Sequence, residues 1–201
     1  MKRHLNQLHA IMSLSLYDSS VKVYIRQLNN LSAILKRAEQ WCDENNKPHS
    51  DIIEARLTPD MYALPFQIRA CTKAARNGTL LTKGWAFTSH PAEPADETFA
   101  GLQARIEKTV GWLESVKPED IEGGEERPLS MYASGEEGKG PLFKYDNGQV
   151  FLTQVIFPEF WFHVAMAYAI CRMKGVPVGK KDWILGGGML DGVTIEGTLP
   201  L

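Results

Sequence analysis

The sequence predicts an all-α protein, a four-helix bundle with a long crossover between the third and fourth helices that carries a small β-hairpin. Three observations predict it. Apolar residues recur every three or four positions in four long segments. Proline, glycine and asparagine residues separate these segments, as is typical of loops between helices. The chain of 201 residues, 44% of them hydrophobic, is long enough to bury one core.

The first helix is predicted from Leu16 to Asn45. Ser15 and Asp18 stand three residues apart at its start, which is a variant of the capping box. Asn45 and Pro48 end the pattern. The apolar positions form one amphipathic stripe, which comprises Val21, Tyr24, Ile25, Leu28, Leu31, Ile34, Leu35, Ala38, Trp41 and Cys42.

The second helix is predicted from Leu64 to Asn77, with Gly78 as a left-handed cap at its C-terminal end. Its start is open, because Pro59 and Pro65 both suit the first turn of a helix.

The third helix is predicted from Asp96 to Val116 and has the most regular periodicity in the chain. Residues 85–95 before it contain two prolines and are predicted to form a loop. In the crossover that follows, residues 118–149, the stretches PLSMYA and PLFKY flank the loop SGEEGKG, which predicts a surface hairpin.

The fourth helix is predicted from Gln149 to Lys174, with a kink at Pro158. It is apolar on nearly every side, so a buried core helix and a membrane span are both compatible with its composition. Glu159 and His163 lie in its middle, where ionisable groups are costly in lipid. We therefore expect a buried core helix and no membrane partner.

The predicted bundle domain spans residues 13–183. An N-terminal extension, residues 1–12, precedes it, and a glycine-rich tail, residues 184–201, follows and is expected to wrap over the surface. Gly175 is the predicted cap between the fourth helix and the segment that leads into this tail.

Composition excludes several classes of protein. The net charge is −2, from 22 basic and 24 acidic residues, so the chain lacks the positive charge of a strongly basic nucleic-acid binder. Cys42, Cys71 and Cys171 are widely spaced without a CxxC motif, which predicts neither a zinc ribbon nor a disulfide scaffold. The N-terminal stretch MKRHLNQLHAIM lacks the apolar region of a secretory signal. We expect a cytoplasmic protein.

Four ordered segments carry a family resemblance: SLSLYDSSVKVYIRQLNNLSAIL, EARLTPDMYALPFQIRAC, ETFAGLQARIEKTVGWLESV and FPEFWFHVAMAYAICRMKGVPVGKKDW. Over about residues 13–183 the chain resembles the DUF1993 family of the DinB/YfiT-like superfamily. This resemblance implies a DinB-like four-helix bundle, often a homodimer, and it implies no settled activity.

The resemblance also bears on metal binding, because better-understood DinB-like relatives hold a divalent metal with three histidines. Two of those histidines lie four residues apart on the last helix. Here His163 has Glu159 one turn before it and Ala167 one turn after it, so the HxxxH pattern is broken. The second helix contributes no histidine. We expect no bound transition metal and no cofactor.

Glu159 and His163 are the sharpest candidate pair, since residues four apart share one helix face. A carboxylate beside an imidazole can orient it, raise its pKa or share a metal with it. The alternative is a core histidine with its hydrogen bonds satisfied inside the bundle. Asp60 could add a third oxygen near the mouth of the bundle, or it could simply cap the second helix.

Tyr17, Tyr24 and Tyr168 are further candidates, because bundles build ligand sites between facing helices and aromatic walls suit flat apolar ligands. The alternative is that these rings pack in the core. The candidate ligand pocket is therefore His163, Glu159, Asp60, Tyr17, Tyr24 and Tyr168, without any assigned catalytic residue.

Three functions remain open. The first is a protein, or a cofactor-free enzyme, that holds a small organic molecule between helices. The second is a metal-dependent transferase or hydrolase of the DinB type, which would use His163, Glu159 and Asp60 as a reduced ligand set. The third is a DNA-binding helix-turn-helix protein, which the charge opposes because no predicted helix offers an Arg/Lys-rich face. We also expect a homodimer through an apolar helix face, since the first helix has more apolar positions than one narrow stripe requires.

Overall fold

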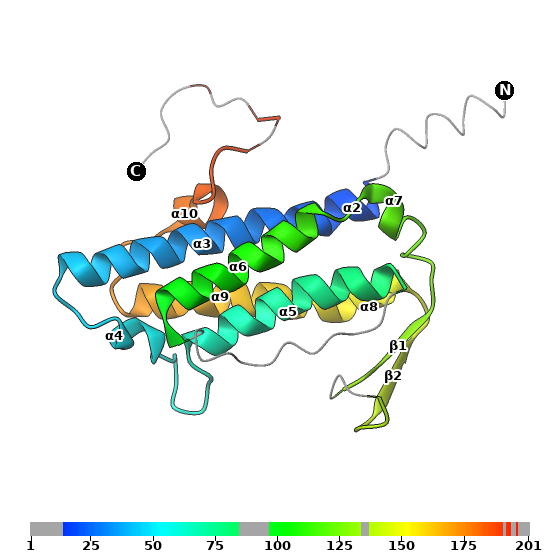
Figure 1. Cartoon of the computed structure of the whole chain (residues 1–201), viewed down its shortest axis with the longest axis horizontal. Coiled ribbons are helices and arrows are strands. Elements are labelled where there is room, and N and C mark those ends of the chain that lie inside the picture. Colours follow the sequence, from blue (N-terminus) through cyan, green and yellow to red (C-terminus); the bar gives the residue numbers. More distant parts are fainter. Residues whose placement is uncertain (1–13, 85–96, 134–136, 191, 194–195, 197–201) are drawn as a thin grey trace.

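The computed structural model describes residues 14–84, 97–133, 137–190, 192–193 and 196 (Figure 1). Of the described residues, 63% are helical, and two short strands form one small sheet among them. The predicted N-terminal extension and the predicted loop at residues 85–95 lie outside the described part.

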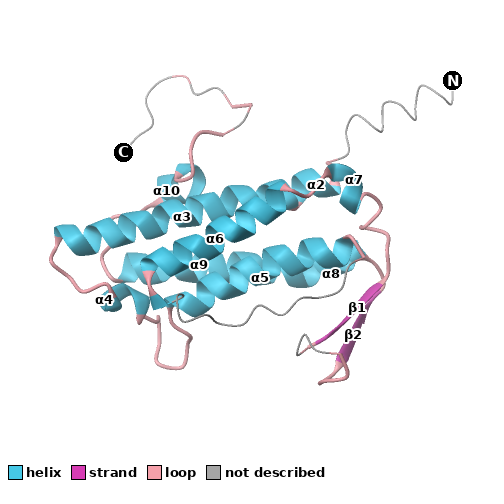
Figure 2. Cartoon of the chain, in the orientation of Figure 1, coloured by secondary structure: helices cyan, strands magenta, loops and turns pink. Residues whose placement is uncertain are grey.

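Four long helices run side by side through the described part of the molecule (Figure 2): α3 (Val21–Glu44), α5 (Leu64–Thr82), α6 (Phe99–Glu114) and α9 (Phe157–Met173). Helix α5 packs against α9 and α6, and α3 packs against α6 and α9. Their inward faces share one apolar core, in which the largest fully buried side chains include Tyr24, Leu28, Ile34, Ile68, Phe99, Leu102 and Phe160.

The first predicted helix is divided into two. Helix α2 (Leu16–Ser19) is separated from α3 by Ser20, whose backbone angles of φ −124° and ψ −73° leave the helical region. The predicted cap is confirmed, because the Ser15 hydroxyl accepts a hydrogen bond from the Asp18 backbone N–H at 3.0 Å.

Helix α5 continues past its predicted end at Asn77. Gly78 is therefore not a cap, which corrects the sequence prediction, and it lies buried inside the helix. A Cβ atom on Gly78 would lie 2.7 Å from the Ile156 side chain, so the glycine allows the fourth helix to approach closely. Pro65, rather than Pro59, occupies the first turn.

The fourth predicted helix forms as α8 (Gly148–Phe151), a π-helical turn η2 (Leu152–Ile156) and α9. The Phe157 N–H donates to the Leu152 carbonyl, five residues back, and Pro158 has no N–H to donate. The wider turn lies directly before this proline, where the regular hydrogen-bond ladder is interrupted. Gly175, with φ +97°, ends the segment as predicted.

Helix α9 is buried on only one face, which corrects the prediction of a helix enclosed by the core. Phe160, Val164 and Ala167 point into the core, whereas Phe162 is 51% exposed and Met173 is 49% exposed. In the described residues, the helix Gly148–Met173 is long and apolar enough to cross a membrane by length and composition alone. A third of its most apolar 18-residue stretch is buried. The outward face is thus apolar as well.

The crossover contains the predicted hairpin. After α7 (Pro118–Ile121), strands β1 (Leu129–Tyr132) and β2 (Leu142–Tyr145) pair antiparallel, with Met131 opposite Phe143. The hairpin projects from the end of the long helices where α8 begins (Figure 1).

Two further short helices lie in the described part. Helix α4 (Ser50–Ile53) follows α3, and α10 (Lys180–Leu185) packs on the outer side of α3 (Figure 1). Since α10 includes residues 184 and 185, the first residues of the predicted tail are helical and lie against the body of the protein.

Candidate functional site

The groove between α5 and α9 brings His163 against Gln67. The Gln67 amide donates from Nε2 to the Tyr62 carbonyl at 2.9 Å, so its Oε1 faces the imidazole. His163 Nδ1 lies 2.8 Å from that oxygen. An amide oxygen only accepts, so Nδ1 carries the hydrogen and Nε2 of the neutral ring keeps a lone pair. His163 is therefore oriented as a hydrogen-bond acceptor or a base through Nε2.

Burial and one nearby cation set the protonation of the groove. Burial lowers the pKa of His163 below its usual 6.5, and the positive charge of Lys73 lowers it further. Burial raises the pKa of Glu159 above its usual 4.5, while Lys73 opposes this rise. The groove thus favours a neutral imidazole and a carboxyl group that holds its proton more tightly than a free glutamate does.

A small cavity of about 130 Å³ opens beside Glu159. Helix α5 supplies Lys73 and Asn77, the fourth helix supplies Val155 and Ile156, and the hairpin supplies Met131. Tyr145 of the hairpin lies near enough for the charge of Glu159 to raise the Tyr145 pKa, after the larger effect of burial. The volume is well below the ~300–1,000 Å³ of pockets that enclose drug-sized ligands, so only a small group fits.

Glu159 and His163 both lie on α9, where the charge of Lys73 on α5 affects the pKa of each, but of the two only Glu159 lines the 130 Å³ cavity, and Asp60 does not line it. Asp60 is exposed in the loop before α5 and accepts a hydrogen bond from the Thr58 hydroxyl. That hydrogen bond lowers the pKa of Asp60. Asp60 lines neither the cavity beside Glu159 nor either of two larger cavities, one beside α2 and one beside the segment after α10.

The three candidate tyrosines pack against other residues rather than lining these cavities. Tyr24 is fully buried, with its ring 4.9 Å from that of Phe160, and burial raises the pKa of its hydroxyl. Tyr168 packs against Trp183 at 5.6 Å. Tyr17 is half-buried on α2, with Lys22 over its ring.

The donor set does not fit the three-histidine metal site of DinB-like relatives. Lys73 places positive charge near His163, which would repel a metal cation. Across the described residues, no group of three or more His, Cys, Asp or Glu side chains is placed to hold a metal ion.

The remaining histidines and cysteines offer no competing site in the described part of the chain. His49 is exposed and lies 2.9 Å from Asp43. Cys42, Cys71 and Cys171 are buried free thiols, and burial raises the pKa of Cys71 and of Cys171 to about 12.

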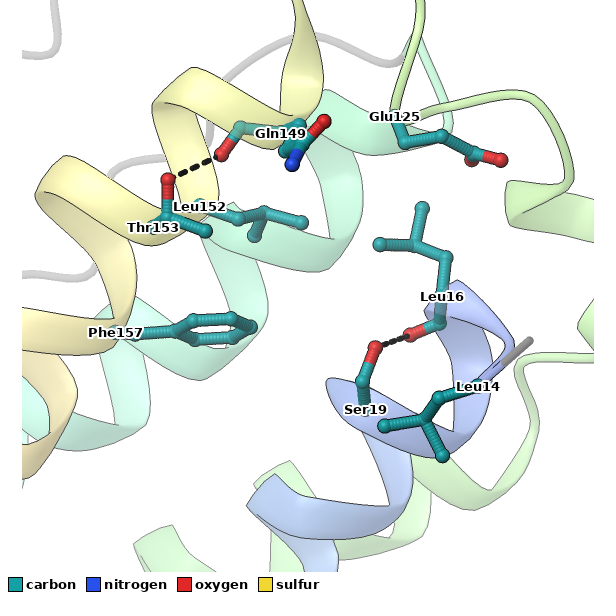
Figure 3. Close-up of a pocket in the computed structure, with 8 residues that line it drawn as sticks. All are labelled: Leu14, Leu16, Ser19, Glu125, Gln149, Leu152, Thr153 and Phe157. Carbon is teal, nitrogen blue, oxygen red and sulfur yellow. Dashed lines mark hydrogen bonds between the residues drawn. The ribbon is translucent and has the colours of Figure 1, made fainter. Parts of the chain in front are cut away.

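A second cavity, of about 340 Å³, lies between α2 and the start of the fourth helix (Figure 3). Figure 3 shows Leu152 and Phe157 on one side and Leu16 on the other, with the Glu125 carboxylate directed away from the Phe157 ring. The Thr153 hydroxyl donates to the Gln149 carbonyl at 2.7 Å. The cavity is mainly apolar and has less acid–base character than the α5–α9 groove.

The fold and the groove together define a mostly helical protein with a small polar groove between two long helices. Within that class, the chain belongs to the DUF1993 family, a domain of unknown function whose model matches residues 16–184. It is similar to a DinB family member from Shewanella denitrificans of known crystal structure, with 26% identity and a TM-score of 0.75 over 90% of this chain and 96% of that one. These findings confirm the resemblance. No curated protein matches the chain.

Sequence reasoning missed Gln67 and Lys73. The prediction of the second helix rests on its apolar periodicity, which does not show which of its polar residues are buried. Gln67 is only 2% exposed, and a long polar side chain on the same side as the apolar residues Ile68 and Cys71 is the signal that could have identified it.

Proposed function

We propose that this protein binds a small organic molecule in the groove between α5 and α9 of a DinB-type four-helix bundle. The observation that supports the proposal is the placement of Glu159 and His163 in one partly buried groove, under the influence of the same lysine, Lys73. Ionisable groups with pKa values shifted by burial cluster at functional sites more than elsewhere.

The groove offers a carboxyl group and an imidazole whose pKa values burial shifts in opposite directions. Glu159, with its raised pKa, retains a proton to higher pH and can donate it, and His163 presents the unprotonated Nε2. Lys73 attracts a negatively charged or strongly polar ligand group to the 130 Å³ cavity. General acid–base catalysis without a cofactor is the second candidate function, because burial raises the pKa of a carboxyl group and lowers the pKa of an imidazole one turn away on the same helix.

A fragment screen tests the proposal. Molecules of a few non-hydrogen atoms, such as propanamide and propanoate, would be titrated into the isotope-labelled protein and followed by amide NMR. We expect shifts around Lys73, Asn77, Val155 and Glu159. His163→Ala should remain folded and weaken binding by about tenfold, consistent with the loss of one hydrogen bond.

His49→Ala is the matched control, since His49 is exposed and belongs to another part of the molecule. It should bind the fragments as the native chain does. Unchanged binding by folded His163→Ala, or shifts centred away from α5 and α9, would exclude the groove as the binding site.

We further propose a homodimer, with the interface on the outward face of α9. The sequence placed the apolar face on the first helix, but α3 exposes Lys22, Lys36 and Gln40. The outward apolar residues of α9 support the new assignment: Phe162, Ala165, Met166, Ala169 and Met173.

A further inference from the structure

A third cavity lies on the opposite side of α9, between α3 and the segment that follows α10. Its volume is about 340 Å³, within the range of pockets that enclose small organic ligands. Trp161, Val23 and Leu190 form apolar walls, and Lys22, Arg26 and Gln27 contribute polar groups.

Arg26 builds the wall of this cavity. Its Nη1 donates to the Met189 carbonyl at 2.9 Å, and its Nη2 donates to the carbonyls of Ile184 at 3.0 Å and Gly188 at 2.6 Å. These three bonds hold the segment after α10 against α3. They leave the Nε–H, which is buried and has no acceptor in the structure.

Gln27 supplies a second donor without an acceptor. The residue is 5% exposed, and its amide nitrogen Nε2 is buried with no hydrogen-bond partner. Its Oε1 faces the Asn30 amide at the long distance of 3.5 Å. Buried donors are nearly always paired in folded proteins, so two unpaired donors on adjacent residues that line one cavity call for an acceptor from outside the chain. The terminal torsion of a glutamine is broad, so Nε2 can turn toward a ligand.

Charge and shape narrow the ligand class. The guanidinium of Arg26 and the ammonium of Lys22, which pairs with Asp18 at 2.6 Å, place positive charge along one side of the cavity. The Trp161 ring, at 36% exposure, provides a flat apolar surface. A ligand that satisfies both features carries an acceptor with negative charge at one end and an apolar ring at the other.

We propose that this cavity binds an arylalkanoic acid, a small carboxylate with an aromatic body. The carboxylate accepts hydrogen bonds from Arg26 Nε and Gln27 Nε2, and the ring packs against Trp161 and Val23. The site shares no lining residue with the cavity beside Glu159, so this proposal can be tested independently of the function proposed for the α5–α9 groove.

The experiment compares three probes of the same shape on the native full-length chain: 3-phenylpropanoate, 3-phenylpropan-1-ol and 3-phenylpropylammonium. Amide and indole NMR would report the site. We expect the carboxylate to shift the Gln27 side-chain amide and the Trp161 indole, and to bind at least about tenfold more tightly than either other probe. Equal binding of the alcohol, stronger binding of the ammonium, shifts centred elsewhere or no binding of the carboxylate would overturn the proposal.

Gln27→Leu separates the binding role from a structural one. Because Nε2 has no partner, the substitution should leave the melting temperature unchanged or raise it, while carboxylate affinity falls about tenfold. Gln149→Leu, in the cavity of similar volume beside α2, is the matched control and should leave the affinity unchanged. His163→Ala should also bind 3-phenylpropanoate normally. Since the probe comparison uses the native chain, it decides the proposal even if Gln27→Leu fails to fold; unchanged affinity in a folded Gln27→Leu would overturn it.

Discussion

The two faces of α9 have nearly the same hydrophobicity but different surroundings. Phe160, Val164 and Ala167 on the inward face are fully buried against α3 and α5, whereas Phe162 and Met173 on the outward face are about half exposed. Glu159 and His163 are partly buried between these extremes. A helix that is apolar on every side therefore need not be enclosed by its own domain.

A strong test of this comparison is the removal of one phenylalanine from each face. Phe160→Ala should lower the free energy of unfolding by about 3–5 kcal/mol, because it removes a fully buried ring and leaves a cavity beside Tyr24. Phe162→Ala should lower it by less than about 1 kcal/mol in the monomer, since half of that side chain is already in water. Urea denaturation at low protein concentration measures both. Similar losses for the two variants would contradict the placement of Phe160 on a buried face and of Phe162 on an exposed one.

The same helix shows how far sequence reasoning reached. The positions of the long helices, the Ser15 cap and the hairpin follow from local patterns, and the structure confirms them. The burial of α9 does not follow, because its near-uniform hydrophobicity carries no periodic signal to distinguish an inward face. In the candidate site, the spacing of Glu159 and His163 predicted only that the two side chains share one face of the helix. Gln67 and Lys73 come from another helix, so identifying them as partners of this pair required the tertiary structure.

The outward face also predicts how the chain associates. Helix α9 is about 25 Å long at 1.5 Å per residue, which is enough for a helix-to-helix contact between two copies. We expect the native chain to be dimeric by light scattering at high micromolar concentration, and Phe162→Glu to shift it to monomer because a buried unpaired charge is costly at an apolar interface.

Phe143→Glu is the matched control for this association. Phe143 is 48% exposed on the hairpin, close to the 51% of Phe162. Phe143→Glu therefore shows whether a charge at any exposed phenylalanine disturbs association, or only a charge on α9. It should leave the dimer intact. A monomeric native chain, or equal dissociation by both substitutions, would contradict an interface on α9, and binding of a monomer to lipid vesicles would assign the face to a membrane instead.

The smallest predicted effect concerns the edge between the two faces, where Glu159 and His163 give opposite pH dependences. The raised pKa of Glu159 means that the folded state holds its proton more tightly than the unfolded state. Its contribution to stability is therefore present below pH 4.5, its ordinary pKa, and is lost as the pH rises through the raised value. The lowered pKa of His163 acts in the other direction: its contribution is present above pH 6.5 and is lost as the pH falls through the lowered value.

Difference curves isolate each group. The unfolding free energy of the native chain minus that of Glu159→Gln should fall as the pH rises from 4.5 and then level, because glutamine does not ionise. The corresponding difference for His163→Gln should rise with pH and level near 6.5. Lys73→Met should move both transitions to higher pH, since the lysine charge lowers the pKa of both groups. Lys108→Met, on an exposed position of α6, should move neither. Curves of the opposite slope, or an equal effect of the two lysines, would show that Lys73 does not set the protonation of this groove.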